Sequence, residues 1–98
     1  MRVMIRFSMP AQASNRAIAD GRLGGILETL HALVKPEATY YLTLSGKRTG
    51  LMFCDLADVS MIPVIAEPLF MGLEAEVDFV PVMSPADLQT GLLAAAGG

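Results

Sequence analysis

The chain contains no tryptophan, one cysteine and one histidine. The single cysteine, Cys54, excludes an internal disulfide and a cysteine-based metal cluster. The single histidine, His31, has no ligand-type residues beside it, which argues against a tightly held metal ion. It also falls in a predicted helix, away from the predicted sheet, although it would be the simplest general base at neutral pH. We therefore expect neither a metal nor a cofactor.

Charged residues are scarce as well, at 17% of the chain, and 7 basic residues stand against 10 acidic ones. The net charge of −3 argues against nucleic-acid binding, which needs a basic face to displace counterions. No apolar run approaches the ~20 residues of a membrane span. The apolar run at the N-terminus is broken by Arg6 and is too short for a signal peptide. We expect a cytoplasmic protein that binds neither nucleic acid nor membranes.

Hydrophobic residues, by contrast, make up 53% of the 98 residues. This length fits a single domain, residues 1–98, and leaves no room for a second. A domain this small is marginally stable alone, and it usually hides excess apolar surface against a copy of itself. The composition therefore predicts a homodimer.

Hydrophobic periodicity indicates the first two elements. Residues 2–9 alternate strictly between apolar and mixed positions, which is typical of a strand. Residues 13–34 then carry apolar residues at helical spacing. Three glycines weaken the first part of this segment, so we expect a loop or a separate turn there and a firm helix from about Leu23. Lys35 and Pro36 mark the end of that helix.

Residues 38–56 predict a β-hairpin, because two β-rich runs flank a turn that carries Gly46 and Gly50. The Gly-Lys pair in that turn is reminiscent of a phosphate-binding loop. Such a loop needs a glycine where Tyr41 stands, and a helix where the chain continues as a strand. The segment is therefore interpreted as a turn with a basic tip.

A second helix is expected over residues 61–73, with Pro68 kinking or breaking it, and an alternating strand over 75–83. The run "SPAD" at 84–87 is a helix-start signature ahead of a short terminal helix. The order β-α-β-β-α-β plus a tail helix predicts an α+β, ferredoxin-like fold with its helices on one face of the sheet. In that fold the first strand pairs antiparallel with the fourth and also neighbours the third.

The two faces of the predicted sheet differ in character. Pairing Leu44 with Leu51 in the hairpin puts four hairpin residues under the helices, together with the apolar side of the first strand. These four are Leu42, Leu44, Leu51 and Phe53. The other face is mixed in composition and suits packing on a second sheet with a cavity between the two. It is formed by Arg2, Met4, Arg6, Tyr41, Thr43, Met52, Cys54, Glu76, Asp78 and Val80.

Three stretches carry a resemblance: "KPEATYYLTLSGKRTGLMFCDLAD", "IPVIAEPLF", and "DFVPVM" ahead of "ADLQTGL". They are similar to a group of small bacterial proteins without an assigned activity, in the dimeric α/β-barrel superfamily. The more specific pieces are the entry at 35–38, the Gly46-x-Arg48-Thr49 turn and the Glu67-Pro68 step. The resemblance spans nearly the whole chain. It implies two ferredoxin-like sheets that face each other to form a barrel.

Five residues are candidate ligand contacts, and two of them lie on neighbouring strands. Arg6 could clamp a carboxylate or phosphate bidentately, or it could form a structural ion pair with Glu76 or Asp78. Asp78 is a candidate in its own right. Tyr41 could donate a hydrogen bond to a ligand or fill the dimer interface.

Cys54 and Arg48 complete the set, and each has two interpretations. Cys54 is either a small buried hydrophobe or a thiolate activated by Arg6, the one cation on an adjoining strand. Arg48 is either part of a solvated turn tip, or a residue that reaches the partner subunit or closes over a pocket mouth.

The sequence predicts a homodimer, paired through the sheet face, that binds a small apolar or acidic molecule in the barrel. The alternative is a cofactor-free isomerase or monooxygenase-like enzyme similar to muconolactone isomerase, with Arg6 orienting the substrate and Tyr41 or Asp78 handling protons. No catalytic motif of the superfamily matches the chain residue by residue, and fold likeness alone assigns no chemistry. The absence of a histidine on the barrel face, and of a nucleophile with its base, favours binding.

Overall fold

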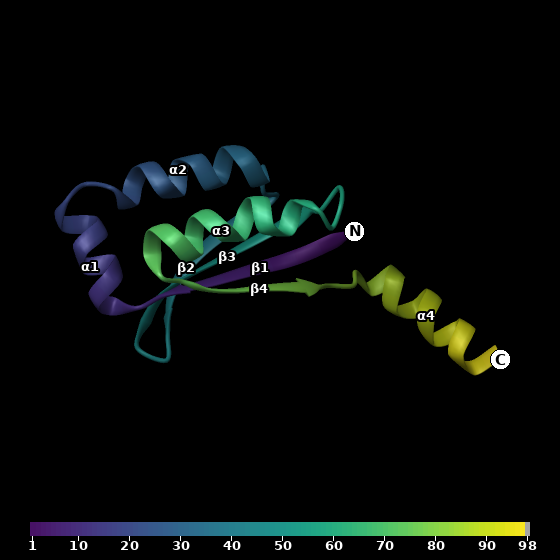
Figure 1. Ribbon diagram of the computed structural model, residues 1–98. Helices are drawn as coiled ribbons and strands as arrows, with labels where there is room; N and C mark the ends of the chain where they lie inside the picture. Colours follow the sequence, from purple (N-terminus) through teal and green to yellow (C-terminus); the bar gives the residue numbers. More distant parts are fainter. Residues whose placement is uncertain (98) are drawn as a thin grey trace.

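The computed structural model describes residues 1–97 as an α+β fold, in which helices cover one face of a four-stranded antiparallel sheet (Figure 1). The elements are β1 (Arg2–Met9), α1 (Ala11–Ala19), α2 (Leu23–Val34), β2 (Ala38–Leu44), β3 (Lys47–Asp55), α3 (Met61–Leu73), β4 (Glu76–Pro81) and α4 (Pro85–Gly97). In Figure 1, α2 and α3 run side by side over the sheet, whereas α4 projects from one end of the molecule.

The strand order confirms the predicted connectivity. It is β2-β3-β1-β4, and the central β1 pairs antiparallel with both β3 and β4. This order is compatible with a ferredoxin-like βαββαβ unit followed by one more helix. The alternation of β1 explains its central place, because Val3, Ile5 and Phe7 are at most 1% exposed beneath the helices.

The segment between β1 and β2 forms two helices, α1 and α2. α2 begins at Leu23 as predicted, but the part before it is helix α1 rather than the expected loop or turn. Gly21 separates the two helices with a φ of 77°, a left-handed conformation that glycine adopts without strain. After α2, Lys35 takes a φ of 50° and Pro36 prevents continuation, so the predicted helix end is confirmed.

Pro68 was predicted to kink or break its helix, and the break is wrong, because α3 continues through it. Proline lacks the N–H that would bond to the carbonyl four residues earlier, so one helical hydrogen bond is lost. The helix nevertheless buries one side against the sheet, through Ile65, Ala66, Leu69 and Leu73. Because most helix stability in proteins comes from such packing, the buried face maintains the helix through the proline.

The hairpin between β2 and β3 is confirmed, but its predicted register is wrong. The turn consists of Ser45 and Gly46 alone, with φ values of 54° and 74°. Positive φ at both central residues is what a two-residue type I′ hairpin turn requires. Leu44 therefore lies opposite Lys47 rather than Leu51.

The hairpin also turns the opposite side toward the helices from the one predicted. Met52 and Cys54 lie beneath the helices, because they pair with Ile5 and Val3 of β1. The hairpin residues predicted for that place lie on the other face of the sheet: Leu42, Leu44, Leu51 and Phe53. Residues 51–54 are all apolar, so the alternation of hydropathy does not distinguish the two sides of β3.

Gly50 fixes this orientation. It lies within β3 opposite Phe7, not in the turn where the sequence predicts it. Phe7 is fully buried, and its ring lies so close to the Gly50 backbone that a Cβ on Gly50 would sit 2.7 Å from the ring atom Cε1. A glycine inside a strand commonly marks such a close approach. The ring needs that space, so this side of β3 must face the helices.

Gly50→Ala is expected to lower the free energy of unfolding by about 1–3 kcal/mol, because the buried Phe7 ring cannot move without disturbing the core. A matched control is Gly24→Ala on α2, where an added Cβ would meet nothing within 4 Å. This control should raise the free energy of unfolding by about 1 kcal/mol through helix propensity. Urea denaturation measures both, and unchanged stability of Gly50→Ala would contradict the close contact.

Candidate functional site

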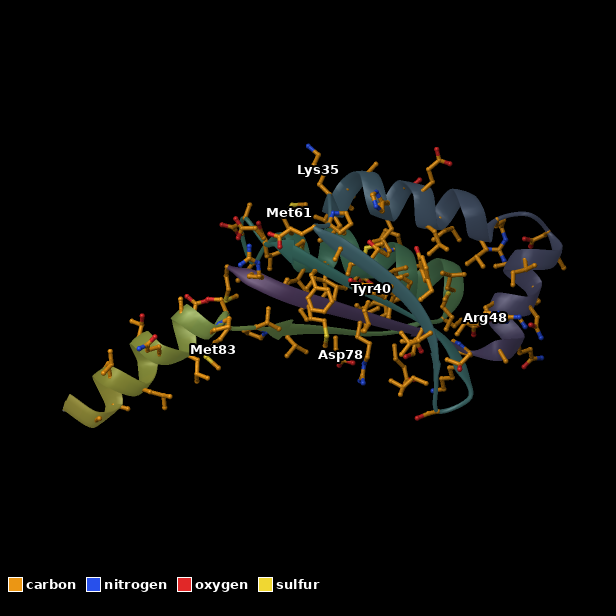
Figure 2. All side chains as sticks on the ribbon, turned by 180° about the vertical axis from the view of Figure 1, so that it is seen from behind. Lys35, Tyr40, Arg48, Met61, Asp78 and Met83 are labelled. Carbon is orange, nitrogen blue, oxygen red and sulfur yellow. The ribbon has the colours of Figure 1, made fainter. Side chains whose placement is uncertain are left out.

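The candidate site is the sheet face that α1, α2 and α3 leave bare, which we call the uncovered face. Register partners form a row across all four strands at its centre, in the order Tyr40, Leu51, Arg6, Asp78. Figure 2 labels Tyr40 and Asp78, which come from opposite edges of the sheet. The row therefore places the Tyr40 phenol, the aliphatic Leu51 side chain, the Arg6 guanidinium and the Asp78 carboxylate next to one another.

The surroundings of this central row are apolar. Met4 and Phe53 in the neighbouring row are partly buried, and Val80 beside them is 39% exposed. Leu42 and Leu44 on β2 are 37% and 40% exposed. Single exposed hydrophobic residues are ordinary, but a contiguous group on one flat face marks a contact or ligand surface.

Arg6 forms an ion pair with Asp78, one of the two structural partners considered for it. Its Nε and Nη2 atoms donate to the same carboxylate oxygen, Oδ2, at 3.1 and 2.6 Å. Both side chains are nearly half exposed, so the pair contributes only about 0.2–1 kcal/mol to stability. A guanidinium carries five N–H donors, and this pair occupies two of them. The remaining donors of Arg6 are available to a second anion.

Two further acid–base pairs frame the same face. Arg2 donates to both carboxylate oxygens of Glu37, at 3.2 and 2.8 Å, and this hydrogen-bonded pairing raises the pKa of the Arg2 guanidinium. Lys47 of β3 forms an ion pair with Glu76 of β4. In each pair the charges balance within one chain.

Of the five predicted site residues, only Arg6 and Asp78 are brought together on the uncovered face. Tyr41 pairs with Gly50, and Cys54 pairs with Val3, so both lie on the helix side of the sheet. Their predicted placement beside Arg6 is wrong because the hairpin has the opposite orientation.

Arg48 also lies on the helix side, since its register partner in β1 is Met9. Its Nη1 donates to Ser14 Oγ at 2.7 Å and to Asn15 Oδ1 at 2.8 Å, both on α1 (Figure 2). Arg48 therefore ties the hairpin to α1, and its side chain is half-buried instead of forming a solvated tip.

The tyrosine on the uncovered face is Tyr40, not Tyr41 as predicted from the sequence. Its side chain is 61% exposed and its register partner is Leu51. Gly50 was the signal that could have identified Tyr40, because a glycine within a strand indicates close packing on that side. Placing Gly50 on the helix side puts Tyr41 on that side too, where it is 56% exposed, and turns Tyr40 to the uncovered face.

Cys54 is a buried thiol on the helix side, at 2% exposure. It contributes to the wall of a hollow of about 310 Å³ near the start of α3. Burial raises the pKa of the Cys54 thiol, and the negative charges of Asp55 and Glu37 raise it further. Arg6 lies on the opposite side of the sheet and cannot activate it. Cys54 is therefore a core residue, not a nucleophile.

Comparison with protein-family models gives no match for the chain, and comparison with curated proteins gives none. Within residues 1–97, no helix is both long enough and apolar enough to cross a membrane. Only the geometry of the uncovered face therefore indicates what the protein could bind. The uncovered face offers apolar contact area beside one guanidinium with free donors, which suits an apolar body that carries an acidic group.

The Cys54 thiol of the native protein is expected to react with a thiol reagent at pH 8 on the order of a hundredfold more slowly than that of the urea-unfolded protein. Burial keeps the reagent away from the Cys54 thiol, and the raised pKa lowers the fraction of the thiol that is present as the reactive thiolate. Because the folded-state pKa is raised, the stability linked to this group is complete below the ordinary thiol pKa and declines as pH rises above it. Equally fast reaction of the folded and unfolded protein would contradict the burial of Cys54.

Proposed function

We propose that two copies of the chain pair through their uncovered faces and hold a small apolar molecule with an acidic group between the two sheets. The observation that carries this proposal is the central row, in which Arg6 lies between the apolar Leu51 and the carboxylate of Asp78. The proposal agrees with the resemblance to the dimeric α/β-barrel superfamily.

Pairing is supported by the composition of the uncovered face. The exposed apolar side chains around Val80, Leu42 and Leu44 lose contact with water when a second sheet covers them. The charges on the face are paired within each chain, so two copies of it meet without strong like-charge repulsion. Facing sheets lie about 10 Å apart, and the mixed long and short side chains of the face leave room for a small ligand.

An acidic ligand is supported by the free donors of Arg6. A carboxylate or phosphate can accept hydrogen bonds from the outer edge of the guanidinium while Asp78 keeps the opposite edge in place. The exposed hydroxyl of Tyr40 is a second donor in the same row. The apolar residues beside the row would then contact the body of the ligand.

The geometry favours binding over the enzymatic alternative. An isomerase or monooxygenase-like reaction would need Tyr41 or Asp78 to handle protons. Tyr41 lies on the helix side of the sheet, away from Arg6. Asp78 already accepts two hydrogen bonds from Arg6, which orient its carboxylate toward that partner.

Phe53→Lys is expected to separate the two sheets and lower the oligomeric state, because it places a charge among the apolar side chains of Met4 and Val80 that the second sheet would cover. The control is Met71→Lys on α3, a residue that is 85% exposed away from the uncovered face. Sedimentation velocity measures the oligomeric state, and circular dichroism verifies that both variants remain folded. A folded Phe53→Lys variant that keeps the oligomeric state of the parent would exclude the uncovered face as an interface.

Arg6→Met is expected to weaken binding of the fluorescent anion anilinonaphthalene sulfonate about tenfold, the effect of losing a charge-assisted hydrogen bond. The control is Arg16→Met. It removes another exposed ion pair, the one with Glu74 at 2.7 Å, which lies away from the uncovered face. Fluorescence titration gives the dissociation constants. If both variants bind the probe like the parent, Arg6 has only a structural role.

A further inference from the structure

The terminal helix α4 has a well-capped N-terminus but no packing partner among residues 1–97. Ser84 and Asp87 form a reciprocal capping box: the Ser84 N–H donates to Asp87 Oδ2 at 3.0 Å, and the Asp87 N–H donates to Ser84 Oγ at 3.1 Å. Yet no described residue of α4 is buried. Leu88, Leu92 and Leu93 are 47%, 60% and 67% exposed. A lone helix of this length is only marginally stable in water, so these leucines need a surface to cover them.

An exposed apolar surface lies between α2 and α3. A hollow of about 450 Å³ there adjoins the one of about 310 Å³ beside Cys54, because Leu33 and Ile65 line both. Together they form one groove along the two helices, which we call the α2–α3 groove. Its apolar wall includes Ile26, Leu30, Leu33, Ile65 and Leu69.

The lengths of α4 and of α2, which forms one wall of the groove, agree. α2 contains 12 residues and α4 contains 13. At a rise of 1.5 Å per residue, both helices are about 18–20 Å long. Small residues permit close approach on both sides: Gly25 lines the groove, Gly91 lies mid-way along α4, and an added Cβ on either would meet nothing within 4 Å. Glycine at helix contacts lets the backbones come together, and neither glycine is required by packing within its own chain.

The charges around the groove are mixed. Arg22 lies at one end, ion-paired with Asp20, and Lys35 lies at the other beside Glu37 and Asp55. Asp87 is the one ionisable side chain in the stretch from Pro85 to Gly97, and hydrogen bonds from Ser84 lower the pKa of its carboxyl group. Because Asp87 is its one ionisable side chain, the stretch from Pro85 to Gly97 can cover the apolar wall without burying further charges.

Within one chain, α4 is directed away from this groove. β4 ends at Pro81, and α4 continues outward from the same end of the sheet (Figure 1). We propose that α4 of one copy lies in the α2–α3 groove of a second copy, with its leucines against the apolar wall. The groove thus becomes an interface between chains. This contact uses none of the residues of the uncovered face, so it can be tested independently of the proposed pairing of the sheets.

Disulfide trapping tests the contact directly. In a Cys54→Ala background, Thr29→Cys in the groove and Leu92→Cys on α4 are expected to form a disulfide between chains, seen as a covalent dimer on a non-reducing gel. The matched control replaces Thr29→Cys with Glu28→Cys, an exposed neighbour on α2 that does not line the groove. Equal yields from the two pairs would overturn the proposal. So would covalent dimers from Leu92→Cys alone, which would mean that α4 pairs with α4.

Filling the groove provides a second test. Gly25→Leu should reduce the rate of formation of the Thr29–Leu92 disulfide about tenfold, because the added side chain occupies the space of α4. Gly24→Leu adds the same side chain to the same helix outside the groove, and it should leave the rate unchanged. Both changes improve helix propensity, so loss of folding is not expected. The same rate in both variants would overturn the proposal.

Phe53→Lys separates this contact from the pairing of the sheets. A Phe53→Lys variant that keeps the oligomeric state of the parent and still forms the groove disulfide would support α4 docking and remove the sheet interface. A dimer that is lost with Phe53→Lys and never forms the disulfide would remove α4 docking and retain the sheet interface.

Discussion

The contact between the Phe7 ring and the backbone of Gly50 decides how the sheet is presented to its surroundings. Phe7 is fully buried in the central strand, and only a residue without a side chain can lie against its ring. Gly50 must therefore face the helices, and every second residue of β3 faces them with it. The other residues of β3, Leu51 among them, are turned to the bare side. The composition of the candidate site thus follows from a contact made in the core.

The sequence predicted those elements whose pattern has one interpretation. β1 alternates cleanly, the capping box at Ser84 is unambiguous, and the strand order follows from the succession of elements. A hydropathy pattern cannot predict which side of the hairpin faces the helices, because Leu51, Met52, Phe53 and Cys54 are all apolar. Its identification required a steric argument about Gly50 rather than a count of apolar residues. The residues predicted for the uncovered face were accordingly correct on β1 and β4, and wrong on β2 and β3.

Ion pairs shape the uncovered face more than they stabilise the fold. Each of the pairs Arg6–Asp78 and Lys47–Glu76 links neighbouring or nearby strands, and each is too exposed to contribute much free energy. Their effect is to leave the face almost without net charge while keeping polar groups in fixed positions. Such a face can be covered by another apolar surface, and it still offers hydrogen bonds at chosen points. On the helix side, the Arg48 contacts with α1 hold the hairpin in place without using a carboxylate.

The position of β2 at the edge of the sheet has a consequence for how the protein misassembles. In the described sheet β2 pairs only with β3, so one row of its backbone N–H and C=O groups is unpaired. The strand, ATYYLTL, contains no charge and no proline, and its aromatic and β-branched residues have high β propensity. Natural edge strands usually carry a charge, a proline or a bulge that blocks edge-to-edge growth. β2 has no such blocking residue, so partly unfolded chains should aggregate by adding strands at this edge.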